Sequence, residues 1–279
     1  MKQNDRLKKN KGLKKYLSFF RLRFAMGLQY RTAALAGIVT QFFWGFMQIM
    51  VLYAFYRADA AAFPMSFSAA VSYIWLQQAF LAIFAGWMME NEIFDSIVTG
   101  NIVYELCRPI RIYNMWFFRS VAHRMAKAVL RCFPILAVAV FLPEPYGMKL
   151  PVDLLHFLLF CVALVLGLLV TVSFCMVVYI LTFFTISPQG LRMLFISAVE
   201  FLSGGVIPLP FFPDAIKKIL ELLPFASMQN AALCIYSGSF SPTQTYRAIG
   251  LQIFWLVTMV GTGKLLCYVA EKKITVQGG

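Results

Sequence analysis

A run near the end of the chain has the composition of a phosphate-binding loop. Residues 261–264 read Gly-Thr-Gly-Lys, and glycine-rich loops that end in lysine cradle nucleotide phosphates in the GxxxxGKS or GxxxxGKT motif. That motif also needs a glycine five residues before Gly263 and a hydroxyl residue after the lysine, yet Thr258 and Leu265 stand there. The run lies inside an apolar stretch and not between a strand and a helix. We therefore predict that this chain itself binds no nucleotide and no other cofactor.

The residue types that carry hydrolytic or metal chemistry form no recognisable set either. The two histidines, His123 and His156, have no cysteines or carboxylates around them at metal-ligand spacing. The HExxH and GxSxG patterns are absent. The six cysteines give no disulfide framework, because most of them fall in apolar runs. The sequence therefore predicts no catalytic residue and no metal site.

Five polar side chains within long apolar runs are the remaining candidates for function. Glu200 is the only acid in such a run, and an ionised carboxylate in a membrane costs ~2.5–3.5 kcal/mol on insertion scales, so it should face protein or water. Gln41 and Gln48 lie seven residues apart on one face of the first run, and Gln77 and Gln78 lie in the middle of the second. These residues either line a substrate path or make hydrogen bonds between helices, worth ~0.6 kcal/mol each.

The apolar runs indicate that this protein lies within a lipid membrane. Of 279 residues, 61% are hydrophobic and 13% are charged, whereas soluble domains carry about 25% charged residues. The mean hydropathy is +0.74. A chain this poor in charge cannot cover itself with polar surface, which excludes a water-soluble enzyme. The sequence predicts an all-α integral membrane protein that forms a single transmembrane domain over residues 1–279.

Six runs are candidates for helices that cross the bilayer, which takes about 20 residues each. The third run contains Lys127 and Arg131, whose long side chains reach toward the membrane surface. The fifth is short and is interrupted by Gly204 and Gly205. The predicted spans cover residues 33–56, 68–89, 125–142, 154–180, 191–207 and 248–270.

The distribution of basic residues predicts the orientation of these spans. The segment before the first span holds ten Lys and Arg residues against the single acid Asp5, which places the N-terminus in the cytoplasm by the positive-inside rule. Six crossings return the C-terminus to the same side. Most of the net charge of +13 is therefore an orienting and membrane-anchoring signal, and we expect no nucleic-acid binding.

The segment before the first span has a helical pattern of its own. Residues 11–31 predict an interfacial amphipathic helix, because basic residues alternate with an apolar stripe at helical spacing. This helix either anchors the chain to anionic lipid or also touches a cytoplasmic partner. The stripe consists of Leu13, Leu17, Phe20, Phe24 and Leu28.

Two further segments outside the spans contain helical patterns of their own, so we expect them to do more than connect two spans. Residues 90–118 are longer than a connection needs and contain a short helical pattern, which predicts a cytoplasmic helix packed on its own bundle or docked into a partner. Residues 208–245 predict an exofacial hairpin between the fifth and sixth spans, which contains an amphipathic helix. The residues that mark a hinge or re-entrant turn before it, where protein must shield irregular backbone from lipid, are Gly204, Gly205, Pro208 and Pro210.

Together these features resemble the ABC-2 type permease family, the membrane subunits of ATP-binding-cassette exporters. The resemblance covers nearly the whole chain. It rests on the basic N-terminal helix, the six spans, TGNIVYELCRPI between spans two and three, GGVIPLPFFP before an amphipathic outer helix, and the terminal KKITVQGG. It implies a multi-pass protein of the prokaryotic cytoplasmic membrane that forms a substrate path and hydrolyses nothing itself.

The resemblance also implies partners. A pair of ATPase subunits would bind ATP and Mg, and a second permease, identical or similar, would complete the path within membrane lipid. Two other classes of protein stay open: a self-sufficient secondary carrier or channel, in which Glu200 is functional, and a non-transport membrane scaffold. The coupling helix that contacts the ATPase in this family would carry Glu92, Ile93, Asp95, Ile97, Glu105 and Arg108.

Overall fold

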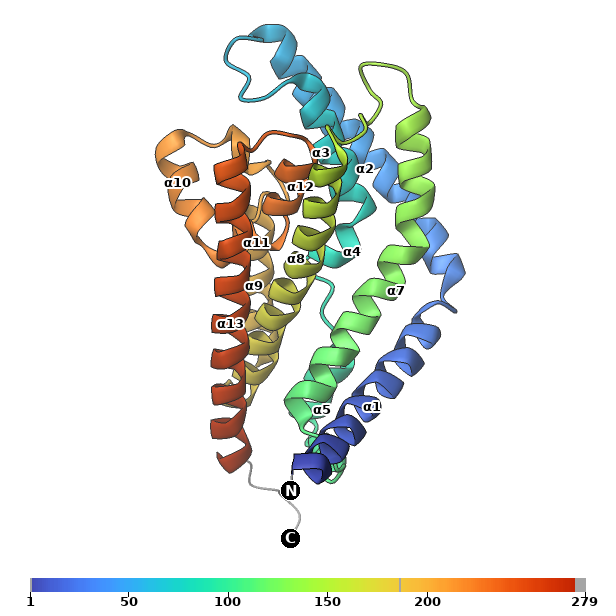
Figure 1. Cartoon of the computed structure of the whole chain (residues 1–279), viewed down its shortest axis with the longest axis vertical. Coiled ribbons are helices and arrows are strands. Elements are labelled where there is room, and N and C mark those ends of the chain that lie inside the picture. Colours follow the sequence, from blue (N-terminus) through green and yellow to red (C-terminus); the bar gives the residue numbers. More distant parts are fainter. Residues whose placement is uncertain (1, 186, 274–279) are drawn as a thin grey trace.

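The chain folds into helices, most of which run roughly along one long axis (Figure 1). The computed structural model describes residues 2–185 and 187–273, so the terminal run of the resemblance from residue 274 on lies outside the described residues, as does the side chain of Leu13. The α-helices are α1 (Lys2–Gly27), α2 (Arg31–Ala58), α3 (Phe67–Ala79), α4 (Leu81–Phe84), α5 (Asn91–Val98), α6 (Ile102–Leu106), α7 (Ile112–Phe141), α8 (Leu154–Leu181), α9 (Pro188–Leu202), α10 (Asp214–Leu222), α11 (Pro224–Met228), α12 (Asn230–Tyr236) and α13 (Pro242–Lys273). Two short 3-10 helices are η1 (Thr182–Phe184) and η2 (Leu209–Phe211).

Within the described part of the chain, three helical stretches are long and apolar enough to cross a membrane. They coincide with the first, fourth and sixth predicted spans, and they confirm that the chain is an integral membrane protein built of helices. The stretches are Arg31–Ala58, Leu154–Phe184 and Pro242–Lys272.

The centre of the bundle is α8, which packs against α13, α12, α11 and α7. A Cβ at Gly167 of α8 would lie 2.3 Å from the carbonyl oxygen of Met228, so only glycine permits this approach of α11. The Nε2 amide of Gln252 in α13 donates to the carbonyl oxygens of Ala163 and Ser227, both at 2.9 Å. One amide side chain therefore joins α13 to α8 and α11.

The second predicted span, residues 68–89, is not one continuous helix. α3 ends at Ala79 and α4 ends at Phe84, and the backbone from Ala85 to Glu90 is not helical. The prediction of an unbroken helix is wrong here. The apolar composition of residues 68–89 predicts burial. It does not predict a break in the helix, because the side chains that supply hydrogen bonds to the break come from other helices.

Two charged side chains from other helices stabilise this break. Nη1 of Arg124 in α7 lies 2.9–3.3 Å from three carbonyl oxygens between residues 82 and 85, and a cation at the carbonyl end of a helix is also favoured by the helix dipole. The N–H of Gly86 donates to Oε1 of Glu200 in α9 at 3.1 Å. The break therefore keeps its hydrogen bonds within the protein.

The segment predicted to be exofacial, residues 208–245, lies partly inside the bundle. α10 stays at the surface, where Ile216 and Ile219 are exposed, but α12 is buried throughout and packs against α8 and α3. The hydroxyl of Tyr73 in α3 donates to Oδ1 of Asn230, the first residue of α12, at 3.2 Å. The sequence predicts a re-entrant turn before this segment, but it does not predict that α12 itself lies buried against α8 and α3.

The N-terminal helix α1 packs along the first half of α7 (Figure 1). The ring of Tyr16 stacks on that of Phe118 with 5.4 Å between centroids, and a Cβ at Gly27 would lie 2.6 Å from Cβ of Ala126. Leu17, a member of the predicted apolar stripe, is 54% exposed. Phe20, Phe24 and Leu28 of the same stripe are partly buried, and Phe20 packs against the core, so most of the predicted stripe lies on the face of α1 that meets the bundle.

Replacing Arg124 by Gln should destabilise the fold, because the carbonyl groups at the end of α4 lose their charged donor. A buried acceptor without a partner costs roughly 1–3 kcal/mol. We expect a clearly lower melting temperature for the purified protein in detergent. Arg31→Gln, a change at an exposed residue at the start of α2, is the control and should melt like the wild type. An unchanged melting temperature for Arg124→Gln would contradict the role assigned to Arg124.

Candidate functional site

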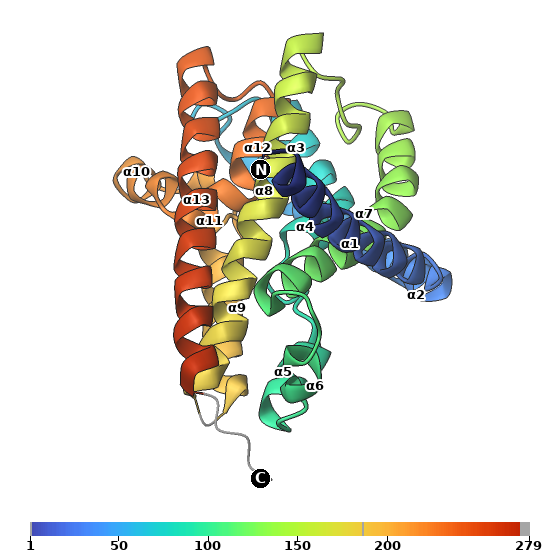
Figure 2. The ribbon, with the colours of Figure 1, turned by 60° about the horizontal axis from the view of Figure 1, so that its bottom comes forward.

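α5 and α6 form a helical pair at one end of the bundle. Gly100 lies between them with a φ of +75°, a left-handed conformation that glycine adopts without steric cost. The start of α1 and the end of α13 lie at the same end of the molecule (Figure 1), and Figure 2 shows α5 and α6 next to each other. We call this the α5 end, and the pair is the candidate functional site.

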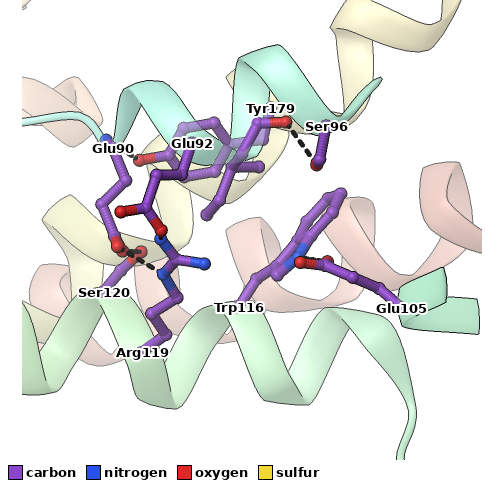
Figure 3. A network of polar contacts seen from close by, with 9 residues as sticks. Glu90, Glu92, Ser96, Glu105, Trp116, Arg119, Ser120 and Tyr179 are labelled. Atoms are coloured by element: carbon purple, nitrogen blue, oxygen red, sulfur yellow. Dashed lines mark hydrogen bonds and ion pairs between the residues drawn. The ribbon is translucent and has the colours of Figure 1, made fainter. Parts of the chain in front are cut away.

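The start of α5 is held by a buried ion-pair network that centres on Arg119 of α7 (Figure 3). Nε of Arg119 donates to Glu90 at 2.5 Å, and the side chains of both residues are less than a tenth exposed. Nη2 of Arg119 pairs with Glu92, and the hydroxyl of Ser120 donates to Glu90 at 3.0 Å. Buried charges need such partners, so the network ties α5 to α7.

A second set of contacts ties the pair to α8 and α7. The N–H of Glu90 donates to the hydroxyl oxygen of Tyr179 in α8 at 2.7 Å, and the ring of Phe94 packs edge-on against Tyr179 with 5.0 Å between centroids. The indole N–H of Trp116 donates to Glu105 of α6 at 2.6 Å. α5 and α6 are therefore fixed to two long helices at once.

The outer surface of the pair differs from the one predicted. Ile93 is fully buried in the chain's own core and Ile97 packs against that core, so the expectation that Ile93 contacts a partner is wrong. Glu92 is exposed but pairs with Arg119, and the carboxylate of Glu105 accepts from Trp116. Asp95 and Arg108 are exposed as expected.

Three exposed apolar side chains of the pair were missed by sequence reasoning. Val98 is 59% exposed, Tyr104 is 74% exposed and Leu106 is 37% exposed. An apolar stripe on a short helix predicts burial without saying against what, so the stripe that contains Ile93 was assigned to a partner. The exposure of Tyr104 and Leu106 could have been predicted from their position, because both residues follow Gly100, where the first helical pattern ends, and neither belongs to the stripe that contains Ile93.

The polar residues predicted to line a path mostly make contacts between elements. Nε2 of Gln78 donates to Oε1 of Gln48 at 3.1 Å, and Nε2 of Gln77 donates to the carbonyl oxygen of Gly205 at 2.6 Å. Glu200 accepts from Gly86. Gln41 is buried, and its side-chain amide has no hydrogen-bond partner among the described residues. The structure thus brings together Gln48 with Gln78, but not the five residues as one site.

The predicted hinge residues form a tight turn after α9. Gly204 has a φ of +90°, and the N–H groups of Gly205 and residue 206 donate to the carbonyl oxygen of Glu200 at 3.0 and 3.2 Å. Pro208 precedes η2, within which Pro210 is buried. The turn is therefore closed by its own backbone and by the amide of Gln77.

The described chain is thus an apolar helical bundle that displays a firmly held helical pair at one end. The family model described as ABC-2 family transporter protein matches residues 34–278. This match covers most of the chain, so the protein belongs to the ABC-2 family of ABC transporter permeases, which confirms the family resemblance. No curated protein matches the chain.

Arg119→Gln should loosen α5, because Glu90 would stay buried without its cationic partner. We expect faster hydrogen-deuterium exchange of backbone amides in residues 91–106, with exchange in α13 unchanged. The control is Arg108→Gln, since Arg108 is exposed and has no ion pair among the described residues. If Arg119→Gln exchanged like the wild type, the network would not be what holds α5.

Two variants, Glu200→Gln and Glu200→Leu, should show whether the fold needs Glu200 as a hydrogen-bond acceptor or as a negative charge. Gln keeps an oxygen that accepts from the N–H of Gly86, whereas Leu leaves that buried donor without a partner, at a cost of about 1–3 kcal/mol. We expect the Gln variant to melt close to the wild type in detergent and the Leu variant to melt lower. An equal loss in both variants would show that the ionised carboxylate is required.

Proposed function

We propose that this chain is the permease subunit of an exporter and that α5 and α6 dock on a separate ATPase subunit. The observation that carries the proposal is the outer surface of the pair. Val98 and Tyr104 are largely exposed apolar side chains on helices whose inner residues are locked into the core. A stiff helical pair with exposed aromatic and aliphatic residues is suited to enter a groove on a partner. Membership in the ABC-2 family supports an ATPase partner in general terms.

In this proposal the α5 end is cytoplasmic and the chain crosses the membrane six times. The crossings are α2, α3 with α4, α7, α8, α9 with the turn after it, and α13. Exposed basic residues of α1, among them Lys14, Lys15 and Arg21, support this orientation by the positive-inside rule. The membrane would be the cytoplasmic membrane of a prokaryote.

Coupling would run from the ATPase through α5 to the spanning helices. A pair of ATPase subunits would bind ATP and Mg and close together, which displaces α5 and α6. Because Arg119 ties α5 to α7 and Tyr179 ties it to α8, both helices would follow that displacement. This chain would hydrolyse nothing and would change only the access to the path.

The substrate path would form against a second permease, identical or similar. Among the predicted path residues, Gln48, Gln77, Gln78 and Glu200 are engaged in contacts within the chain, and Gln41 is buried. α2 instead presents a stripe of exposed apolar side chains at helical spacing, which suits contact with a second permease and with membrane lipid. The stripe consists of Leu35, Val39, Phe43, Met47, Val51 and Phe55.

Asp95→Arg and Tyr104→Ala should weaken the association with the proposed ATPase subunit. A few contact residues, often aromatic ones, supply most of the energy of an interface at about 2 kcal/mol or more each, so we expect at least about tenfold less ATPase in a pull-down. The control is Glu144→Arg, the same charge reversal at a residue that is 84% exposed in the loop between α7 and α8. Normal binding by Asp95→Arg and Tyr104→Ala would disprove docking through this surface. If no ATPase binds the wild type, the result favours a self-sufficient carrier or channel over the permease, with a non-transport scaffold as the other alternative.

A further inference from the structure

A cavity of about 470 Å³ lies where α1 turns into α2. Its walls come from the end of α1, the start of α2, α7, and the segment from Met89 to Glu92 that leads into α5. The cavity is therefore bounded by the helix that precedes the first span and by the foot of the α5–α6 pair. It is separate from the outer surface of that pair.

The cavity is lined by more cations than its acids can neutralise. Glu90 and Glu92 are its acids, and both pair with Arg119. The remaining cations of the lining are Arg23, Lys127 and Arg131, and none has an ion pair among the described residues. His123 also lines the cavity. The lining thus has four basic side chains and two acids, which leaves the half-open cavity with a net charge of +2.

The hydrogen-bonding capacity of these cations is largely unused. Nε of Arg131 is buried and has no hydrogen-bond partner among the described residues. Its guanidinium lies across α2 at Gly37, where a Cβ would come within 2.5 Å of Cζ. Nζ of Lys127 makes a weak contact with Sδ of Met88 at 3.7 Å. Unpaired donors that are partly desolvated favour an anionic oxygen ligand.

The electrostatics of α1 agree with this conclusion. Burial and the nearby charge of Arg119 lower the pKa of Arg23 from its usual range, and these effects outweigh the opposite effect of the nearby carboxylates. Beside the cavity mouth the surface becomes apolar, since Met26 is 44% exposed and Tyr30 is 71% exposed, and Leu35 lies just beyond. A ligand with an anionic head and an apolar tail would fit both surfaces.

We propose that this cavity binds a phosphate group, held by Arg23, Lys127 and Arg131. Arginine presents donors in a planar fork that matches phosphate oxygens, and lysine adds a compact charge. The exposed apolar residues at the mouth favour the headgroup of an anionic membrane lipid, since basic pockets between helices at the cytoplasmic surface bind such headgroups. A soluble phosphate compound is the other source of the same chemistry.

The test uses native mass spectrometry of the purified full chain in detergent, titrated with phosphatidylglycerol or with phosphatidylcholine. We expect one phosphatidylglycerol per chain, bound about tenfold more tightly than phosphatidylcholine. Arg23→Gln with Lys127→Gln should weaken the binding of phosphatidylglycerol by about tenfold. The matched control is Lys15→Gln with Arg21→Gln, which removes two exposed charges of α1 that are not among the residues lining the cavity and should leave the binding unchanged.

A competition with inorganic phosphate distinguishes the two sources. If millimolar inorganic phosphate displaces the lipid from the wild type, the site accepts soluble phosphate compounds; if it does not, the site takes lipid headgroups. Both results support a phosphate site. Equal lipid binding by the cavity variant and the control variant would overturn it. Arg23→Gln alone, on a surface helix, repeats the test if the double variant fails to fold, and Lys127→Arg should retain binding.

Discussion

The structure depends on one constraint: backbone that leaves the helical path inside an apolar bundle must find all its hydrogen bonds within the protein. The chain leaves that path after α4 and again after α9. Arg124 and Glu200 satisfy the first break, and Gln77 reaches the second. Burying a polar side chain among apolar helices costs free energy. The hydrogen bonds that Arg124, Glu200 and Gln77 make to the non-helical backbone explain why these residues are there.

α7 carries the basic residues that organise the α5 end. Arg124 bonds to the end of α4 and Arg119 pairs with the acids at the start of α5, so one helix fixes both ends of the non-helical connection. Lys127 and Arg131, further along the same helix, face the cavity beside that connection. A displacement of α5 therefore acts on the same helix that a ligand in the cavity would touch.

In the proposed mechanism a separate ATPase drives the chain, which requires a stiff element that this partner can move. α5 and α6 are stiff because Ile93 and Phe94 belong to the core, and because hydrogen bonds from their flanks reach α7 and α8. Their outer side chains remain free for contact. Family membership and this rigid attachment support one account of the chain, in which force enters at α5 and is delivered to the spanning helices.

The sequence by itself determined that the chain is an integral membrane protein of helices, because low charge and long apolar runs leave no other solvent than lipid. It also indicated the family, a displayed segment after residue 90 and the turn at Gly204. Only the tertiary structure decided that residues 68–89 are broken, that α12 returns into the bundle, and that Ile93 faces inward. Periodicity reveals that a face is buried, but the partner that buries it comes from residues far away in the chain, such as Arg124, Tyr179 and Glu200.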